Sequence, residues 1–132
     1  MRALLVIGVL GVAGFLSSVP AAAAPLDGSA PILCALSEVH SCSREGGCER
    51  APLEPGDVFW RVNVQQRVVG TLDGRRTSPI ATVQREDGRL LLQGMQNARV
   101  WGLVLDEQTG QFWVTVTEWD GALAFTGTCA AL

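Results

Sequence analysis

The 132-residue sequence contains no tyrosine, and its only histidine is His40. It also contains no lysine, so every basic residue is an arginine, and the formal net charge is −3. Arg75 and Arg76 are the only adjacent basic pair, so the chain lacks the positive stripe that displaces counterions from nucleic acid. We therefore expect no nucleic-acid partner. The apolar run at residues 3–16 is too short to span a bilayer as a permanent anchor, and no second run of spanning length follows it.

Residues 1–23 have the features of an export signal. An arginine follows the first methionine, residues 3–16 are apolar and uncharged, and small residues then supply an A-x-A cleavage site. We expect cleavage after Ala23, because cleavage one residue later would place Pro25 beside the broken bond. Leu33 is too bulky for a lipoprotein cleavage site before the following cysteine. The sequence thus predicts a periplasmic or secreted protein without a membrane anchor, and a retained N-terminal anchor is the alternative.

Beyond the signal, no segment keeps an apolar period of 3.6 residues over three turns, so no long helix is expected. Short runs rich in Val, Thr, Leu and Trp instead alternate with turn signals such as Asp87-Gly88 and Asp120-Gly121, which is typical of antiparallel hairpins. The predicted strands are 32–40, 58–64, 67–72, 79–85, 89–95, 99–105, 111–119 and 122–129. We predict a loose N-terminus at 24–31 and a loop at 41–57 with at most a short helical turn.

These strands predict an all-β fold: a small antiparallel eight-stranded meander that forms one domain over residues 32–132. A meander either closes on itself or leaves two edges open to other chains. The sequence leaves open whether this one is a closed barrel or a flattened sandwich, and whether it holds a cavity.

The four cysteines predict which parts of the sheet are linked by disulfides. Cys34 and Cys129 lie in the first and last predicted strands, and their bond would close a loop of about 95 residues. The chain-entropy estimate for that loop is about 4–5 kcal/mol of stability. Cys42 and Cys48 are then left to pair across a small glycine-containing loop. Four cysteines allow three connectivities, and we predict the pairing Cys34–Cys129 with Cys42–Cys48. Disulfide bonds also predict an oxidising compartment.

No residue pattern indicates an enzyme, a metal or a cofactor. His40 lies near Cys42 and Cys48, but the spacing H-x-C-x5-C matches no common zinc arrangement. No serine lies in a G-x-S-x-G sequence. Acidic residues such as Asp73 and Asp106 fall in turn segments, where they favour the bends. We therefore expect a protein that binds without catalysing.

The four tryptophans are the most suggestive side chains. Trp60 and Trp101 are expected to fill the core. If the apolar residues between 112 and 116 face inward, Trp113, Thr115 and Trp119 face outward, and exposed aromatic rings on a strand favour a contact surface. An N-terminal tail that covers the rings is the alternative.

The stretch from Asp87-Gly88 through Asn97, Trp101 and Thr109-Gly110 to Cys129 resembles small exported proteins of Gram-negative bacteria that have no assigned activity. In outline the chain is also similar to lipocalins and to periplasmic lysozyme inhibitors with eight-stranded barrels. It departs from the lipocalin Gly-x-Trp signature, because Gly56 precedes Trp60 by four positions. The resemblance implies a small closed barrel and brings no functional residue with it.

Together these features predict an exported, non-enzymatic binding protein. Its expected ligand is a small apolar molecule inside the barrel, because eight strands can enclose one small ligand. The expected lining residues are Trp60, Leu92, Trp101, Leu103 and Phe125. The alternative is a protein-interaction module, such as an inhibitor of a cell-wall-degrading enzyme, that contacts its partner through Trp113, Thr115 and Trp119.

Overall fold

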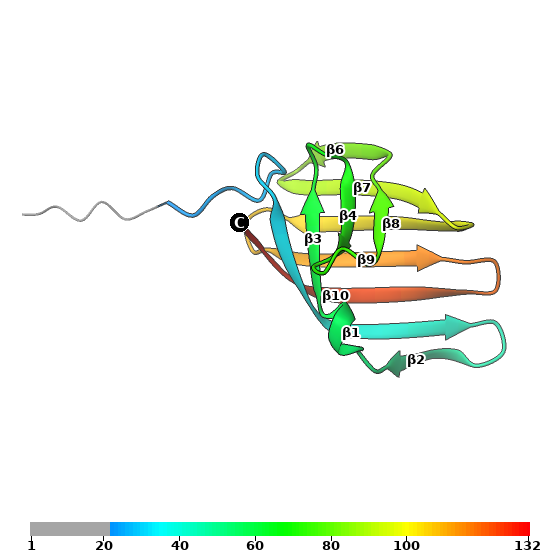
Figure 1. Ribbon diagram of the computed structural model, residues 1–132. Helices are drawn as coiled ribbons and strands as arrows, with labels where there is room; N and C mark the ends of the chain where they lie inside the picture. The colour runs from blue at the N-terminus through cyan, green and yellow to red at the C-terminus, as the bar shows by residue number, and fades with distance from the viewer. Residues whose placement is uncertain (1–21) are drawn as a thin grey trace, which may run out of the picture.

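The computed structural model describes residues 22–132, so the predicted signal peptide at 1–23 lies almost wholly outside the described residues (Figure 1). The described chain is all-β, with one short 3-10 helix. The strands are β1 (Ile32–Ser43), β2 (Gly47–Ala51), β3 (Phe59–Asn63), β4 (Val68–Thr71), β5 (Thr77–Pro79), β6 (Thr82–Glu86), β7 (Arg89–Gln96), β8 (Arg99–Asp106), β9 (Gln111–Thr117) and β10 (Gly121–Ala131), and the helix η1 covers Pro55–Asp57.

All the strands belong to one antiparallel sheet in the order β5-β4-β3-β1-β10-β9-β8-β7-β6, with β2 also paired to β1. The first and last strands are therefore neighbours. Cys34 lies opposite Cys129 in the register of β1 and β10, and the two form a disulfide. Cys42 lies opposite Cys48 in the β1–β2 hairpin, and these two are also bonded. The predicted disulfide pairing is confirmed.

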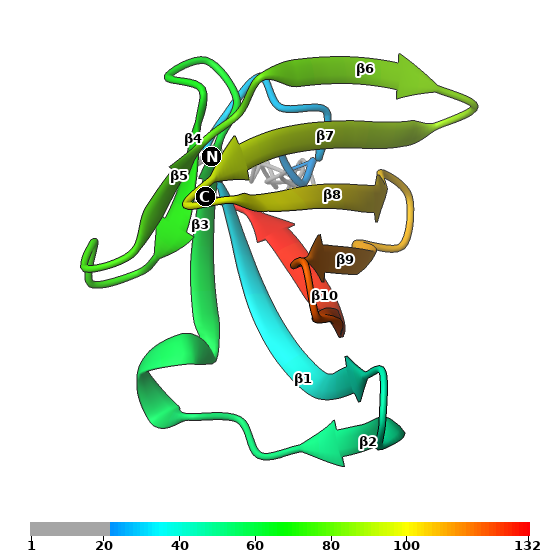
Figure 2. The same cartoon turned by 90° about the vertical axis from the view of Figure 1, so that its right-hand side faces the viewer.

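β1 is the strand that makes the sheet curl. It pairs with β10 along its whole length, but the register shifts between Leu36 and Glu38, so Ser37 is an extra residue that forms a β-bulge. On its other edge, the first part of β1 pairs with β3 and the last part with β2. Because a bulge bends its strand, β1 turns from the direction of β3 to that of β10 (Figure 1). The strands β3–β5 consequently cross over β6–β8, and the sheet forms a half-barrel (Figure 2).

The concave side of the half-barrel holds the hydrophobic core. Alternate residues of the strands point inward, as the burial of Leu90 and Leu92 in β7 and of Leu103 and Leu105 in β8 illustrates. The N-terminal segment contributes as well, because Leu26 packs against this core. The core is completed by Ile32, Cys34, Leu36, Val62, Val69, Ile80, Trp101, Phe112 and Cys129.

The two ends of the strand order, β5 and β6, follow each other in the chain and are joined by Ile80 and Ala81. The amide of Ile80 donates to the carbonyl oxygen of Arg67 at 2.9 Å, and the amide of Ala81 donates to that of Gln93 at 2.8 Å. This corner is thus tied to the β3–β4 turn on one side and to β7 on the other, although β5 and β6 do not pair as strands.

Trp101 holds the same corner from inside. Its indole Nε1–H donates to the Ser78 hydroxyl oxygen at 2.8 Å, which links β8 to β5. Its ring lies over Gly94, its cross-strand partner, where a Cβ would overlap the ring and the carbonyl oxygen of Pro79. Gly94 is therefore needed for a close approach between strands.

The structure corrects the predicted strands in two places. The segment 41–57, predicted as a loop, contains β2 as well as η1, because Cys42–Cys48 joins a regular two-stranded hairpin. The single strand predicted at 79–85 is two strands, β5 and β6, on either side of the corner after Pro79. Ten strands therefore replace the predicted eight, and they form a half-barrel.

Candidate functional site

The five residues predicted to line an interior site lie together in the core. Leu92, Trp101 and Leu103 are buried, and Leu92 and Leu103 are cross-strand partners. Trp60 and Phe125 are half-buried and pack against the same cluster. Neither of the two open surface grooves described below is lined by any of the five. Their contacts with one another are those of core packing.

The outer side of β7, β8 and β9 presents a different kind of surface. The register aligns Val104 with Trp113 across β8 and β9, and Val100 with Met95 across β8 and β7. These four side chains are exposed: 61% for Trp113, 67% for Met95, 54% for Val100 and 41% for Val104. We call the outward side chains of these strands, apart from Arg89, Asp106 and Gln111 at one end, the Trp113 face; they are Leu91, Gln93, Met95, Val100, Gly102, Val104, Trp113, Thr115 and Thr117.

Gly102 lies at the centre of the Trp113 face, between Val100 and Val104. It is opposite Thr115 in β9, and the nearest atom to a Cβ placed on it would be 4.0 Å away. Space is therefore available there, and no side chain stands between Val100 and Val104 along β8 on this face. Trp113 lies next to this open position, opposite Val104 in the neighbouring strand.

The Trp113 face carries no charge. On the outward side of β7 to β10, the only charged residues are Arg89 and Asp106, which lie opposite each other at one end. Protein surfaces normally mix charges of both signs. Depletion of charge together with exposed Trp and Met is instead the composition of the centre of a protein–protein interface.

The structure separates the three residues predicted to contact a partner. Trp113 and Thr115 lie on the Trp113 face, whereas β9 ends at Thr117 and leaves Trp119 in the following turn, 83% exposed. There the guanidinium carbon of Arg44 lies 5.7 Å from the centre of the Trp119 ring, in a cation–π contact. Trp119 therefore lies outside the Trp113 face, where the β9–β10 turn meets Arg44 of the β1–β2 turn.

Sequence reasoning missed Met95, Val100 and Val104. The signal for the two valines was present: Trp101, Leu103 and Leu105 alternate as the inward residues of β8, so the residues between them must point outward. An uninterrupted apolar run conceals this alternation, because both faces of the strand are hydrophobic.

The surroundings of His40 are polar and open. His40 Nε2 lies 3.4 Å from a carboxylate oxygen of Glu38, and Arg50 Nε lies 3.7 Å from the same oxygen, on the exposed side of β1 and β2. Both nearby cysteines are in a disulfide. Among residues 22–132, no three His, Cys, Asp or Glu side chains come close enough together to hold a metal ion.

The carboxylates of two turns act on their own backbone, as predicted. Asp106 accepts hydrogen bonds from the amides of Gln108 and Thr109, and the Thr109 amide holds the pKa of Asp106 below its ordinary value. Asp73 accepts from the Thr71 hydroxyl and from the Arg75 amide, which lower its pKa to about 2. These groups stabilise bends.

A charged groove of about 480 Å³ lies beside η1 and the β4–β5 turn. Its charges are largely paired with each other: Asp57 with Arg76, and Asp73 with Arg75. Such pairs leave little charge available for a ligand.

Comparison with known proteins finds no matching family model, no similar curated protein and no similar solved structure. Within the part of the chain that the structure describes, no helix is long and apolar enough to cross a membrane.

Proposed function

We propose that this protein is an exported, disulfide-bonded β domain that binds a protein partner through the Trp113 face. The observation that carries the proposal is the 61% exposure of Trp113 on an uncharged strand surface shared with Met95, Val100 and Val104. A large exposed apolar patch favours an interaction site, and aromatic residues at the centre of such a patch contribute most of the binding energy.

The exposed area of Trp113 sets the scale of the effect. A tryptophan of about 250 Å² that is 61% exposed offers about 150 Å² for burial. At about 25 cal/mol per Å², full burial contributes up to about 4 kcal/mol. We therefore expect Trp113→Ser to weaken partner binding by roughly 30- to 500-fold, the range of a binding hot spot.

The two disulfides are consistent with an oxidising compartment. We propose that this compartment is the periplasm or the extracellular space, as the N-terminal signal predicts. A partner in either place would be an exported protein with an uncharged apolar patch. A cell-wall-degrading enzyme is the example of such a partner that the alternative interpretation of the sequence gives.

The test compares three immobilised proteins: wild type, Trp113→Ser and Trp119→Ser. Each is exposed to a periplasmic extract and, separately, to purified lysozymes, and bound proteins are identified by mass spectrometry. We expect one protein to bind wild type and Trp119→Ser but not Trp113→Ser. Equal binding by all three would contradict the proposal. Trp119→Ser is the matched control because it removes a more exposed ring from outside the Trp113 face.

A second candidate function is the binding of a small apolar molecule on the concave side. Trp60 and Phe125 favour it, because both rings border the core and are only half-buried. It requires β5 and β6 to act as one bent strand that completes a barrel, which the hydrogen bonds of Ile80 and Ala81 support. Tryptophan fluorescence titrated with lipids and apolar metabolites tests it, and an unchanged spectrum across the panel would exclude it.

A further inference from the structure

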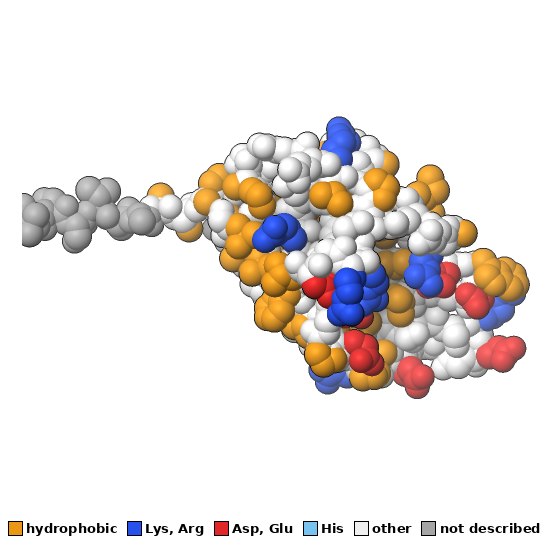
Figure 3. Space-filling view, in the orientation of Figure 1, with side chains coloured by type: hydrophobic (Ala, Val, Ile, Leu, Met, Phe, Trp, Pro, Cys, Tyr) orange, Lys and Arg blue, Asp and Glu red, His pale blue; other side chains and the backbone are white. Residues whose placement is uncertain are grey.

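A second groove lies on the outer side of β3, β4 and β5, away from the Trp113 face. It has a volume of about 430 Å³, within the range of small-molecule sites. Hydrophobic side chains gather on this side of the molecule over β1 and β3 (Figure 3). The groove is lined by Pro31, Arg61, Asn63, Gln66, Val68, Gly70, Thr71, Leu72, Gly74, Thr77 and Leu132.

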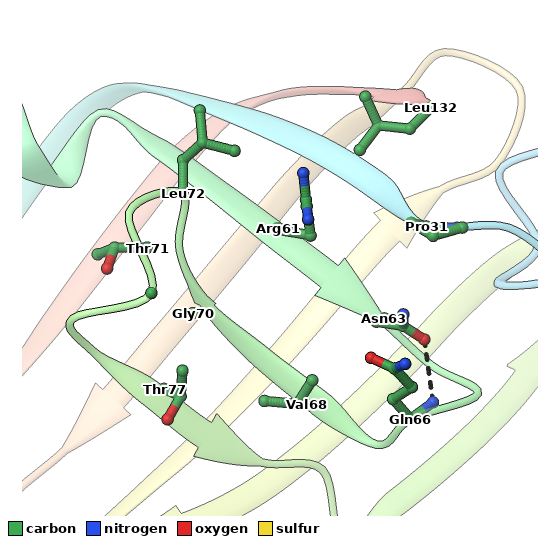
Figure 4. A pocket seen from close by; sticks show the side chains of 11 residues that line it. Pro31, Arg61, Asn63, Gln66, Val68, Gly70, Thr71, Leu72, Thr77 and Leu132 are labelled. Atoms are coloured by element: carbon green, nitrogen blue, oxygen red, sulfur yellow. Dashed lines mark hydrogen bonds between the residues drawn. The ribbon is translucent and has the colours of Figure 1, made fainter.

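Arg61 is the only charged side chain in this lining, and no Asp or Glu accompanies it. It projects from β3 between Leu72 and Leu132 (Figure 4). Within residues 22–132, Arg61 forms neither an ion pair nor a side-chain hydrogen bond. Most other described arginines are engaged: Arg50, Arg75, Arg76, Arg85 and Arg99 pair with carboxylates, Arg67 donates to backbone carbonyls, and Arg44 lies over Trp119.

The surroundings of Arg61 are mostly apolar. Leu72 and Leu132 are 49% and 56% exposed and stand at the edges of the groove with Pro31 and Val68. Gly70 lies opposite Arg61 in β4, so the floor beside the guanidinium is bare backbone. A Cβ at this position would overlap the carbonyl oxygen of Arg76.

We propose that this groove binds an aliphatic carboxylate, with the carboxylate on the Arg61 guanidinium and the alkyl chain along Leu72 and Leu132. A guanidinium presents two parallel N–H donors that match the two oxygens of a carboxylate. One cation without a second beside it suits a single negative charge. The apolar edges then bury the alkyl chain of the ligand. A site for a small anion alone would need no such apolar edges. The site is independent of the Trp113 face.

In the test, decanoate is added below its critical micelle concentration. Its binding is measured by isothermal titration calorimetry and by amide NMR shifts. We expect decanoate to bind and to shift the amides of Gly70 and Gly74. Decanol keeps the chain and loses the charge, whereas acetate keeps the charge and loses the chain. Each should bind at least tenfold more weakly than decanoate.

Substitutions in the groove test which side chains contribute to decanoate binding. Arg61→Gln should weaken decanoate binding roughly 10- to 100-fold, because charge-assisted hydrogen bonds are lost. Leu72→Asn should weaken it as well. Arg89→Gln removes the same charge from an exposed strand position outside the groove and should change nothing.

Three results would overturn the proposal: no decanoate binding, equal binding by wild type and Arg61→Gln, or shifts confined to core residues such as Leu92 and Leu103. The last would instead support a ligand on the concave side. Capture of a partner protein through Trp113 should be unaffected by Arg61→Gln, so either proposal can fail without the other.

Discussion

Removal of the Cys34–Cys129 disulfide should cost this protein far more stability than removal of Cys42–Cys48. The first bond joins β1 to β10, the two strands that meet when the sheet curls, and its cysteines are 1% and 5% exposed within the core. The second bond joins neighbouring strands of a hairpin on the outside of the sheet. The perturbation is a pair of double variants, Cys34→Ala/Cys129→Ala and Cys42→Ala/Cys48→Ala.

The separations along the chain set the two magnitudes. Cys34 and Cys129 are 95 residues apart, and the loop-closure estimate is about 4.7 kcal/mol. Cys42 and Cys48 are 6 residues apart, which gives about 2.2 kcal/mol. Loss of the buried sulfur atoms adds to the first figure. A domain of this size has about 5–15 kcal/mol of stability in total, so the first variant should lose much of it.

Urea denaturation followed by tryptophan fluorescence measures both losses, with thiol counting to confirm that the remaining pair stays bonded. We expect the two variants to differ by about 2 kcal/mol or more. Alanine is preferred to serine because a hydroxyl at residue 34 or 129 would be buried without a partner. Equal losses, or a larger loss from Cys42→Ala/Cys48→Ala, would refute the reasoning that the bond between β1 and β10 holds the curled sheet together.

The remaining predictions concern two glycines and one carboxylate. Gly127→Ala should destabilise the fold by about 1–3 kcal/mol, because a Cβ there would overlap the carbonyl oxygen of Ala35, whereas Gly102→Ala has open space and should stabilise it by about 0.5–1 kcal/mol. Urea midpoints measure both, and a reversed order would contradict the packing described. Asp73 has a folded pKa of about 2, below its ordinary 3.8, so its contribution to stability is present above about pH 4 and falls away between pH 4 and 2. In Asp73→Asn, the urea midpoint should change less between pH 4 and 2 than it does in wild type. The same change with pH in both proteins would show that the Asp73 carboxylate does not contribute.

Local chemistry made the hairpins and both disulfides predictable. Asp87 and Gly88 both have positive φ, 50° and 73°, as expected for the Asp-Gly signal of a two-residue hairpin turn. Cys34 and Cys129 fall at the same inward position of the first and last strands, so their pairing followed once the meander was assumed. The outward direction of Trp113 was predictable from the alternation around Phe112.

The curl of the sheet depends on features that sequence patterns do not show. The bulge at Ser37 changes which residues of β1 face inward, and nothing in the residue order marks it. The turn in the chain after Pro79 likewise depends on contacts with Gln93 and Trp101, which are distant in sequence. The groove around Arg61 was not predictable for the same reason, because its walls come from segments far apart in the chain.

The pairing of β1 with β10 also sets the order in which the molecule can form. One long edge of β1 has no hydrogen-bonding neighbour until a segment about 95 residues further along the chain is in place. Contacts this distant make assembly slow. Under the export proposed above, a chain that completes its fold only when its last strand is present would stay extended while it crosses the membrane, and Cys34 and Cys129 would be oxidised only on the far side.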